Sequence, residues 1–346
     1  MSSMYSFVCD YGEGAHPQIL KAMVSANLVQ TDGYGEDQFC DKARSLIKQH
    51  LNNNNVDIYF VSGGTQANII SISSSLKQYE AIIAAESAHI STSETGAIEA
   101  TGHKVIELPT NDGKINAQQV ADIMEMHLGD VHNVLPKAVF ISNSTEIGTI
   151  YSKEELLAIR ETCNRYGLYM YLDGARLGTA LVSANNNLSM SDLCDIFDIF
   201  YIGGTKNGAW LGEAIVVVND NLKPNFRYNI KQKGALFAKG KLLGIQFIEL
   251  FEQDLYFKLA QHSTNMGIHI RNAFISNGYQ MFSDSYTNQQ FVVIPNEMLA
   301  KFDEKYRTTI WCPYDENSTV VRFVTSWATN KEMVAQLVED IKKFKE

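Results

Sequence analysis

Residues 56–76, VDIYFVSGGTQANIISISSSL, indicate the fold class of this chain. The apolar run 56–61 is typical of a buried strand, the glycines that follow it mark a turn, and 66–76 has helical spacing. Similar units recur, with strands expected at 81–85, 105–108, 138–141, 168–172 and 199–202, and helices at 118–127 and 153–166. Short apolar strands that alternate with helices predict an α/β fold, in which helices cover both faces of a mostly parallel sheet.

The last third of the chain has a different pattern. Residues 237–274 predict long helix, interrupted near glycines and charged residues. Beyond residue 279, strands expected at 290–294 and 319–325 alternate with helices expected at 296–306 and 330–344. We therefore expect an N-terminal arm (1–15), a large domain (16–250) and a small C-terminal α+β domain (251–346) that includes the arm.

The charge balance limits the classes of partner. The 346 residues include 29 basic and 39 acidic side chains, a net charge of −10, which argues against nucleic acid and anionic membranes. No export signal is evident, and no apolar run approaches the ~20 residues that span a bilayer. The five scattered cysteines lack zinc-like spacing, so we expect free thiols, no metal and a cytoplasmic location.

Ligands of open α/β sheets bind beyond the carboxyl ends of the strands, and the sequence after residue 61 suits an anion. The stretch SGGTQAN, residues 62–68, offers backbone N–H groups at the start of a helix, where a phosphate binds favourably. A simple strand-to-helix turn, capped by Ser62 or Thr65, is the alternative. The stretch matches neither a Walker loop nor the dinucleotide fingerprint.

Two further strand ends carry an acid and an amine. Asp173 follows the strand at 168–172, either as a functional carboxylate or as a helix cap, and Arg176 could pair with it. Lys206 lies within GGTKNG, residues 203–208, where burial would lower the pKa of its amine; a solvated loop lysine is the alternative. A phosphate cradle, an acid and a lysine together are what pyridoxal phosphate requires.

Several motifs extend this interpretation over nearly the whole chain. They are DGYGED at 32–37, SGGTQAN at 62–68, ESAHI at 86–90, STEIGTIYS at 144–152, YLDGARLGTALV at 171–182, GGTKNG at 203–208 and VVRFVTSWAT at 320–329. With them the chain resembles the threonine aldolase/β-eliminating lyase family of fold-type I pyridoxal-phosphate enzymes. GGTKNG followed by GEAIV is most similar to a low-specificity branch that includes phenylserine aldolases.

The resemblance implies roles for the matching positions. Lys206 would bind the cofactor covalently, Asp173 would pair with its pyridine nitrogen, and His89 would stack on the ring and move protons. The remaining cofactor and substrate contacts would come from Gly64, Thr65 and Gln66 at the phosphate, and from Arg176 and Arg322 at the substrate carboxylate.

Two positions depart from the family pattern, and two lysines have open roles. Cys9 stands where relatives often have a serine that contacts the substrate carboxylate, so it is a candidate substrate-binding residue. Asn207 replaces a common glycine and leaves the substrate preference open. Lys231 or Lys239 would reach a neighbouring subunit's cofactor or lie on a solvated helical face.

The activity that the resemblance implies is retro-aldol cleavage of a β-hydroxy-α-amino acid of the L-threonine or L-allo-threonine type to glycine and an aldehyde. The alternatives are β-elimination from an amino acid, cleavage of an aromatic substrate such as phenylserine, and a non-catalytic protein that only binds the cofactor. The resemblance further implies a cytoplasmic homodimer or homotetramer with active sites at the dimer interface.

Overall fold

The computed structural model describes residues 4–345, and a seven-stranded sheet forms its centre. In spatial order the strands are β2 (Asp57–Val61), β8 (Glu213–Val217), β7 (Ile199–Gly203), β6 (Tyr169–Asp173), β5 (Leu135–Ser142), β3 (Glu80–Ala85) and β4 (Val105–Leu108). Neighbouring strands are parallel except at β8, which pairs antiparallel with both β2 and β7. The predicted mostly parallel sheet is confirmed.

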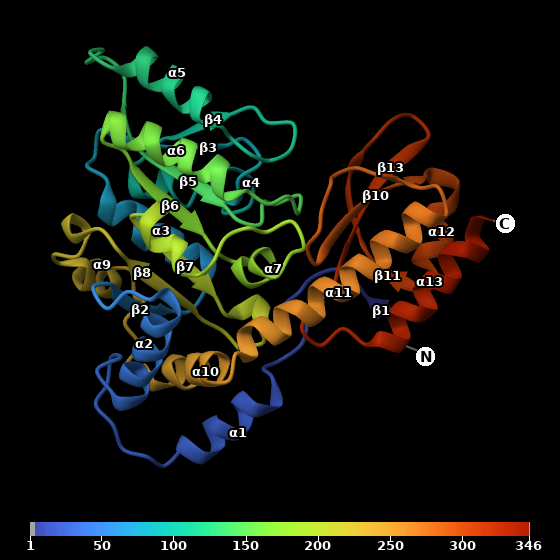
Figure 1. Ribbon diagram of the computed structural model, residues 1–346, viewed down its shortest axis with the longest axis horizontal. Helices are drawn as coiled ribbons and strands as arrows, with labels where there is room; N and C mark the ends of the chain where they lie inside the picture. The colour runs from blue at the N-terminus through green and yellow to red at the C-terminus, as the bar shows by residue number, and fades with distance from the viewer. Residues whose placement is uncertain (1–3, 346) are drawn as a thin grey trace.

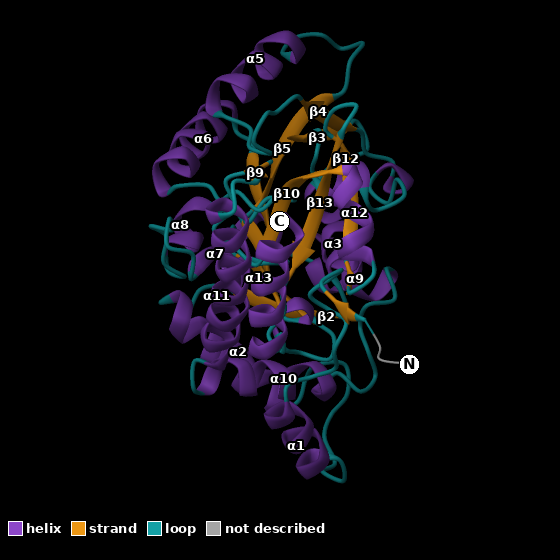
Figure 2. Ribbon diagram, turned by 90° about the vertical axis from the view of Figure 1, so that its right-hand side faces the viewer, coloured by secondary structure: helices purple, strands orange, loops and turns teal. Residues whose placement is uncertain are grey.

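Helices cover both faces of this sheet, which explains why β3, β7 and β8 are buried along their whole length (Figures 1 and 2). The helices are α1 (Pro17–Ala26), α2 (Gln38–Leu51), α3 (Gly64–Ser75), α4 (His89–Thr92), α5 (Ala117–His127), α6 (Lys153–Tyr166), α7 (Leu177–Leu181), α8 (Asp192–Ile196), α9 (Phe226–Gln232) and α10 (Lys241–Glu252). Three short 3₁₀ turns are η1 (Glu99–Thr101), η2 (Thr205–Asn207) and η3 (Asp220–Leu222). Figure 2 shows α3 and α9 on one side of the strands and α5, α6 and α8 on the other.

A second, antiparallel sheet lies beside the first and is reached through the long helix α11 (Leu255–Ser276) (Figure 1). Its strands, in spatial order, are β12 (Thr309–Pro313), β13 (Ser318–Val324), β10 (Gln289–Pro295) and β9 (Gln280–Met281). Helices α12 (Asn296–Asp303) and α13 (Lys331–Lys345) complete this part. The N-terminal segment joins it, because β1 (Tyr5–Ser6) pairs with β11 (Tyr306–Arg307).

Two large hydrophobic clusters form most of the core of the described chain, and a third, small one joins Ile147 to Phe291, Val293 and Val320. One fills the large sheet and its helices and ends along the chain at Leu259. The other contains Phe7 together with residues from Met266 to Ile341. The first cluster includes Ala15 and continues past residue 250, so it crosses both expected boundaries, and the division into residues 1–15, 16–250 and 251–346 stays a prediction.

Some elements agree with the sequence-based expectation and others differ from it. The helical stretch expected over 237–274 is interrupted near charged residues, as predicted: α10 and α11 are separated where the chain turns at Asp254, which has a left-handed backbone. The helix expected over 296–306 ends at Asp303, since Tyr306 joins strand β11. Helices α1 and α2 were not predicted. In the described part of the chain, no helix combines the length and apolar character that crossing a membrane requires.

Candidate active site

A cavity of about 610 Å³ lies at the edge of the large sheet where β2, β6 and β7 end. Eight of the nine predicted site residues line it: Cys9, Gly64, Thr65, His89, Asp173, Arg176, Lys206 and Arg322. Parallel strands bring their carboxyl ends to the same edge of a sheet, so the sequence motifs that follow them meet there.

Lys206 lies in η2, in the turn directly after β7. The residue is half-buried, and burial together with the positive charge of Arg176 lowers the pKa of its amine. Gly208 ends the turn with a φ of +93°, a conformation that side chains rarely adopt. The amine therefore has an environment that favours its neutral, nucleophilic form.

Asp173 is the last residue of β6 and is buried. Its Oδ1 accepts hydrogen bonds from the Tyr201 hydroxyl at 2.5 Å and from the Ala175 N–H at 3.0 Å. Its Oδ2 accepts one from Asn68 Nδ2 at 3.1 Å. The carboxylate is thus fixed by neutral donors, and no cation among the described residues forms an ion pair with it.

The start of helix α3 forms the anion-binding part of the cavity. Gly63 caps the helix without a side chain, so no side chain satisfies the N–H groups of the first turn. A Cβ at Gly64 would lie 2.9 Å from the Tyr201 hydroxyl that bonds to Asp173, which explains the glycine. Gln66 does not line the cavity; its Oε1 accepts hydrogen bonds from the N–H and Oγ of Ser62. Its predicted phosphate role stays a prediction.

His89 begins the short helix α4 and forms a pair with a carboxylate that the sequence analysis did not single out. Its Nδ1 lies 2.8 Å from Oε1 of Glu94, whose side chain is fully buried. The same Glu94 oxygen accepts a hydrogen bond from Asn68 Nδ2 at 2.7 Å. Asn68 therefore connects the His89–Glu94 pair to Asp173.

Two more carboxyl groups line the cavity, that of the buried Glu213 and that of the half-buried Glu146. Glu213 accepts hydrogen bonds from the Gly204 N–H at 2.8 Å and the Thr205 hydroxyl at 2.7 Å, and burial raises its pKa to about 7. Burial also raises the pKa of Glu146, which bonds to the Ser142 hydroxyl. Glu213 is not found by looking at the carboxyl ends of parallel strands, because β8 is antiparallel and begins at this edge.

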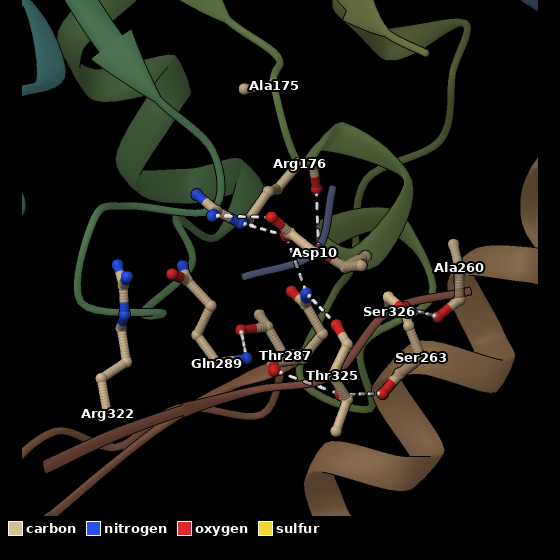
Figure 3. Close-up of polar contacts among 12 residues, drawn as sticks. Asp10, Ala175, Arg176, Ala260, Ser263, Thr287, Gln289, Arg322, Thr325 and Ser326 are labelled. Carbon is tan, nitrogen blue, oxygen red and sulfur yellow. Dashed lines mark hydrogen bonds and ion pairs between the residues drawn. The ribbon is translucent and has the colours of Figure 1, made fainter. Parts of the chain in front are cut away.

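Arg176 pairs with Asp10 of the N-terminal segment, not with Asp173 as the sequence suggested. The bond is bidentate, with Nε to Oδ2 at 2.7 Å and Nη2 to Oδ1 at 3.1 Å (Figure 3). Asn288 adds a donor to Asp10 Oδ2 at 2.9 Å. Although burial opposes ionisation, the charges of Arg176 and Lys206 hold the pKa of Asp10 below its ordinary value.

Arg322 faces the same cavity from β13. Its guanidinium lies over the Trp311 ring, 5.4 Å from the centroid, and its Nη2 donates to the Val8 carbonyl at 3.3 Å. Lys231 and Lys239 are exposed and do not line the cavity; the Lys231 ammonium lies over the Tyr34 ring. Their predicted reach into a neighbouring subunit stays a prediction.

The donor set fits pyridoxal phosphate. The uncapped start of α3, with glycines at 63 and 64, offers N–H groups for a phosphate. Asp173 is a fixed carboxylate that suits a pyridinium N–H, and Lys206 is an amine with a lowered pKa that suits an aldehyde. All three line one cavity, as the cofactor's size requires.

Comparison with known proteins agrees with this geometry. The beta-eliminating lyase family matches residues 9–297. A low-specificity L-threonine aldolase from Pseudomonas aeruginosa is 30% identical over 97% of this chain and 96% of its own. The solved Leishmania major threonine aldolase is 44% identical, with a TM-score of 0.97 over 99% of this chain and all of its own. A histidinol-phosphate aminotransferase from Clostridium acetobutylicum shares the fold alone, with 13% identity and a TM-score of 0.73 over 99% of both chains.

These matches confirm the fold-type I architecture and the predicted resemblance, and they agree with a pyridoxal-phosphate cofactor. The chain belongs to the beta-eliminating lyase family.

Proposed function

We propose that this protein cleaves β-hydroxy-α-amino acids of the L-threonine or L-allo-threonine type to glycine and an aldehyde. The similarity to the Pseudomonas aeruginosa and Leishmania major threonine aldolases supports this substrate class. The observation that carries the proposal is the His89–Glu94 pair beside Lys206 and Asp173 in one cavity. Retro-aldol cleavage needs a base for a hydroxyl proton, and this pair provides one.

The cofactor-binding groups have separate tasks in this proposal. When bound, pyridoxal phosphate supplies a protonated ring that withdraws electrons from the substrate's Cα. Asp173 would keep the proton on the ring nitrogen, and the first turn of α3 would bind the phosphate. Lys206, whose amine has a lowered pKa, would hold the aldehyde group of the cofactor.

His89 takes the proton of the substrate's β-hydroxyl group. The Glu94 carboxylate accepts Nδ1–H, which leaves Nε2 free as the acceptor. Loss of the hydroxyl proton allows the Cα–Cβ bond to break, so that Cβ leaves as an aldehyde and Cα, after receiving a proton, as glycine. Arg176 and Arg322 bind the substrate carboxylate and so orient the bond to be broken.

A product assay separates this proposal from its alternatives. With L-allo-threonine we expect glycine and acetaldehyde in equal amounts, whereas β-elimination would release ammonia and a keto acid. A protein that only binds the cofactor would release neither. Lys206→Ala should abolish both turnover and the yellow colour of the bound cofactor; a variant with full activity would overturn the role of Lys206.

We further propose a cytoplasmic homodimer or homotetramer whose active sites lie at the subunit interface. Exposed apolar side chains at and just after α1 support an interface, since Val24 is 78% and Leu28 92% exposed. Sedimentation analysis of the wild type and of Val24→Lys tests this assignment. A monomeric wild type that retains full activity would contradict it.

A further inference from the structure

Gln289, the first residue of β10, has a buried side chain whose two polar atoms lack a hydrogen-bond partner among residues 4–345. The residue lines the active-site cavity. A buried amide that makes no hydrogen bond costs free energy, so native proteins almost always give such a group a partner. The missing partner of Gln289 is therefore expected to be a ligand in the cavity.

The surroundings of Gln289 indicate the charge of that ligand. Figure 3 shows its carboxamide pointing toward the Arg176 guanidinium and, in this view, lying between Arg176 and Arg322. Arg176 uses Nε and Nη2 on Asp10, which leaves Nη1 for other partners. Arg322 has an unpartnered buried Nε, and no carboxylate in the described chain forms an ion pair with it. Arg176, Asp10 and Arg322, which surround the Gln289 amide and form the subsite discussed here, together carry one uncompensated positive charge.

The backbone of β10 fixes the position of this amide. Gln289 pairs with Val324 of β13, and its carbonyl accepts a hydrogen bond from the Ser285 hydroxyl at 2.6 Å. Side chains alternate between the two faces of a strand, so the next residue, Gln290, faces away from the cavity. Gln290 is equally buried, does not line the cavity, and its Nε2 donates to the Thr287 carbonyl at 2.8 Å.

We propose that Gln289 binds the substrate's α-carboxylate, as a neutral third donor beside Arg176 and Arg322, and that it selects carboxylates over amides and alcohols. The inference rests on the function proposed above. In the complex the amide Nε2–H would donate to one carboxylate oxygen, and Oε1, which has no partner among the described residues, would be available to a guanidinium N–H. A neutral donor adds a hydrogen bond without adding charge, so one anion still balances the charge of the subsite.

Equilibrium binding of the product glycine to the cofactor-loaded enzyme tests the inference without turnover. Calorimetry would compare glycine with glycinamide and ethanolamine, which lack the carboxylate. Gln289→Met should weaken glycine binding about 10- to 150-fold, the effect of losing a hydrogen bond to a charged group. Binding of glycinamide and ethanolamine should change less than about threefold, so the preference for the carboxylate falls.

Two variants control the experiment. Gln290→Met has the same substitution on the opposite face of β10 and should leave all three affinities unchanged. Gln289→Glu places a negative charge between the arginines and should weaken glycine binding further than Gln289→Met does. In steady state, Gln289→Met should raise KM for L-allo-threonine with kcat within about threefold of the wild type.

The inference is overturned if Gln289→Glu binds glycine as the wild type does. It is also overturned if Gln289→Met keeps the wild-type preference for glycine, or weakens all three ligands equally. Failure of the wild type to release glycine from L-allo-threonine would instead contradict the proposed function, because the carboxylate preference is measured by binding alone.

Discussion

Replacing Asn68 with leucine should disconnect the two carboxylates of the active site. Asn68 Nδ2 donates to Glu94 Oε1 at 2.7 Å and to Asp173 Oδ2 at 3.1 Å. Its Oδ1 accepts a hydrogen bond from the Tyr171 hydroxyl at 2.7 Å. Leucine has a similar shape and would fill the space, so Asn68→Leu removes the hydrogen bonds with little change in packing.

The size of the effect follows from the hydrogen bonds that each carboxylate retains in Asn68→Leu. Asp173 keeps its bonds to Tyr201 and Ala175. Glu94 keeps only His89, because its Oε2 has no partner among the described residues. A hydrogen bond to a charged group contributes about 1.5–3 kcal/mol. Without the Asn68 hydrogen bond, Glu94 is less firmly fixed and positions His89 less well. At about 1.4 kcal/mol for each factor of ten, the loss of that hydrogen bond corresponds to a fall in kcat/KM of about 10- to 150-fold.

The assay is aldehyde release from L-allo-threonine at saturating cofactor, with Tyr171→Phe as the matched control. Tyr171→Phe removes one hydrogen bond to Asn68 and leaves both carboxylate contacts, so kcat/KM should stay within about threefold. Asn68→Leu should also have a smaller effect in a Glu94→Gln background, because the two residues act together. Equal effects of Asn68→Leu and Tyr171→Phe, or strict additivity with Glu94→Gln, would refute the reasoning.

Three further predictions concern pH and the cofactor. Burial raises the pKa of Glu213 to about 7, above its ordinary 4.5, so in the cofactor-free protein the contribution of this group to the free energy of unfolding falls as pH rises through this range. Relative to the cofactor-free wild type, Glu213→Gln should gain up to about 3 kcal/mol between pH 5 and 8 in denaturant unfolding, and a difference independent of pH would contradict this. Asp10→Asn leaves Arg176 buried without an ion pair and should lower the free energy of unfolding by about 3–5 kcal/mol at pH 7. Because the folded-state pKa of Asp10 is lowered, that difference should shrink as pH falls below about 4, and one that persists at pH 3 would count against the pair. Gly64→Ala places a Cβ 2.9 Å from the Tyr201 hydroxyl and should weaken pyridoxal-phosphate affinity about tenfold in spectroscopic titration; unchanged affinity would disprove the steric argument.

The sequence predicts the large sheet well because each strand is a short apolar run followed by a turn. Lys206 and Asp173 could be found by the same logic, since each stands directly after such a strand. The sequence alone does not predict Glu213, which begins an antiparallel strand and therefore reaches the same edge from the opposite direction. Helices α1 and α2 were not predicted, although the buried residues of α2, Cys40, Ala43, Ile47 and Leu51, have helical spacing.

Contacts between distant parts of the chain explain the other omissions. Asp10 and Arg176 are 166 residues apart, and Asn288 is 278 residues from Asp10, so no local pattern connects them. The nearby carboxylate at 173 was the more obvious candidate partner for Arg176, and it is occupied by neutral donors instead. Gln289 belongs to none of the sequence motifs. Its proposed role in carboxylate binding rests on its unpartnered amide, which lines the cavity only in the folded chain.

The most direct test of the account is to locate the cofactor's attachment site. The purified protein, saturated with pyridoxal phosphate, would be reduced with borohydride, digested and mapped by mass spectrometry. We predict one modified residue, Lys206, in the peptide that contains GGTKNG. Modification of a different lysine, or no modification at all, would contradict the central claim.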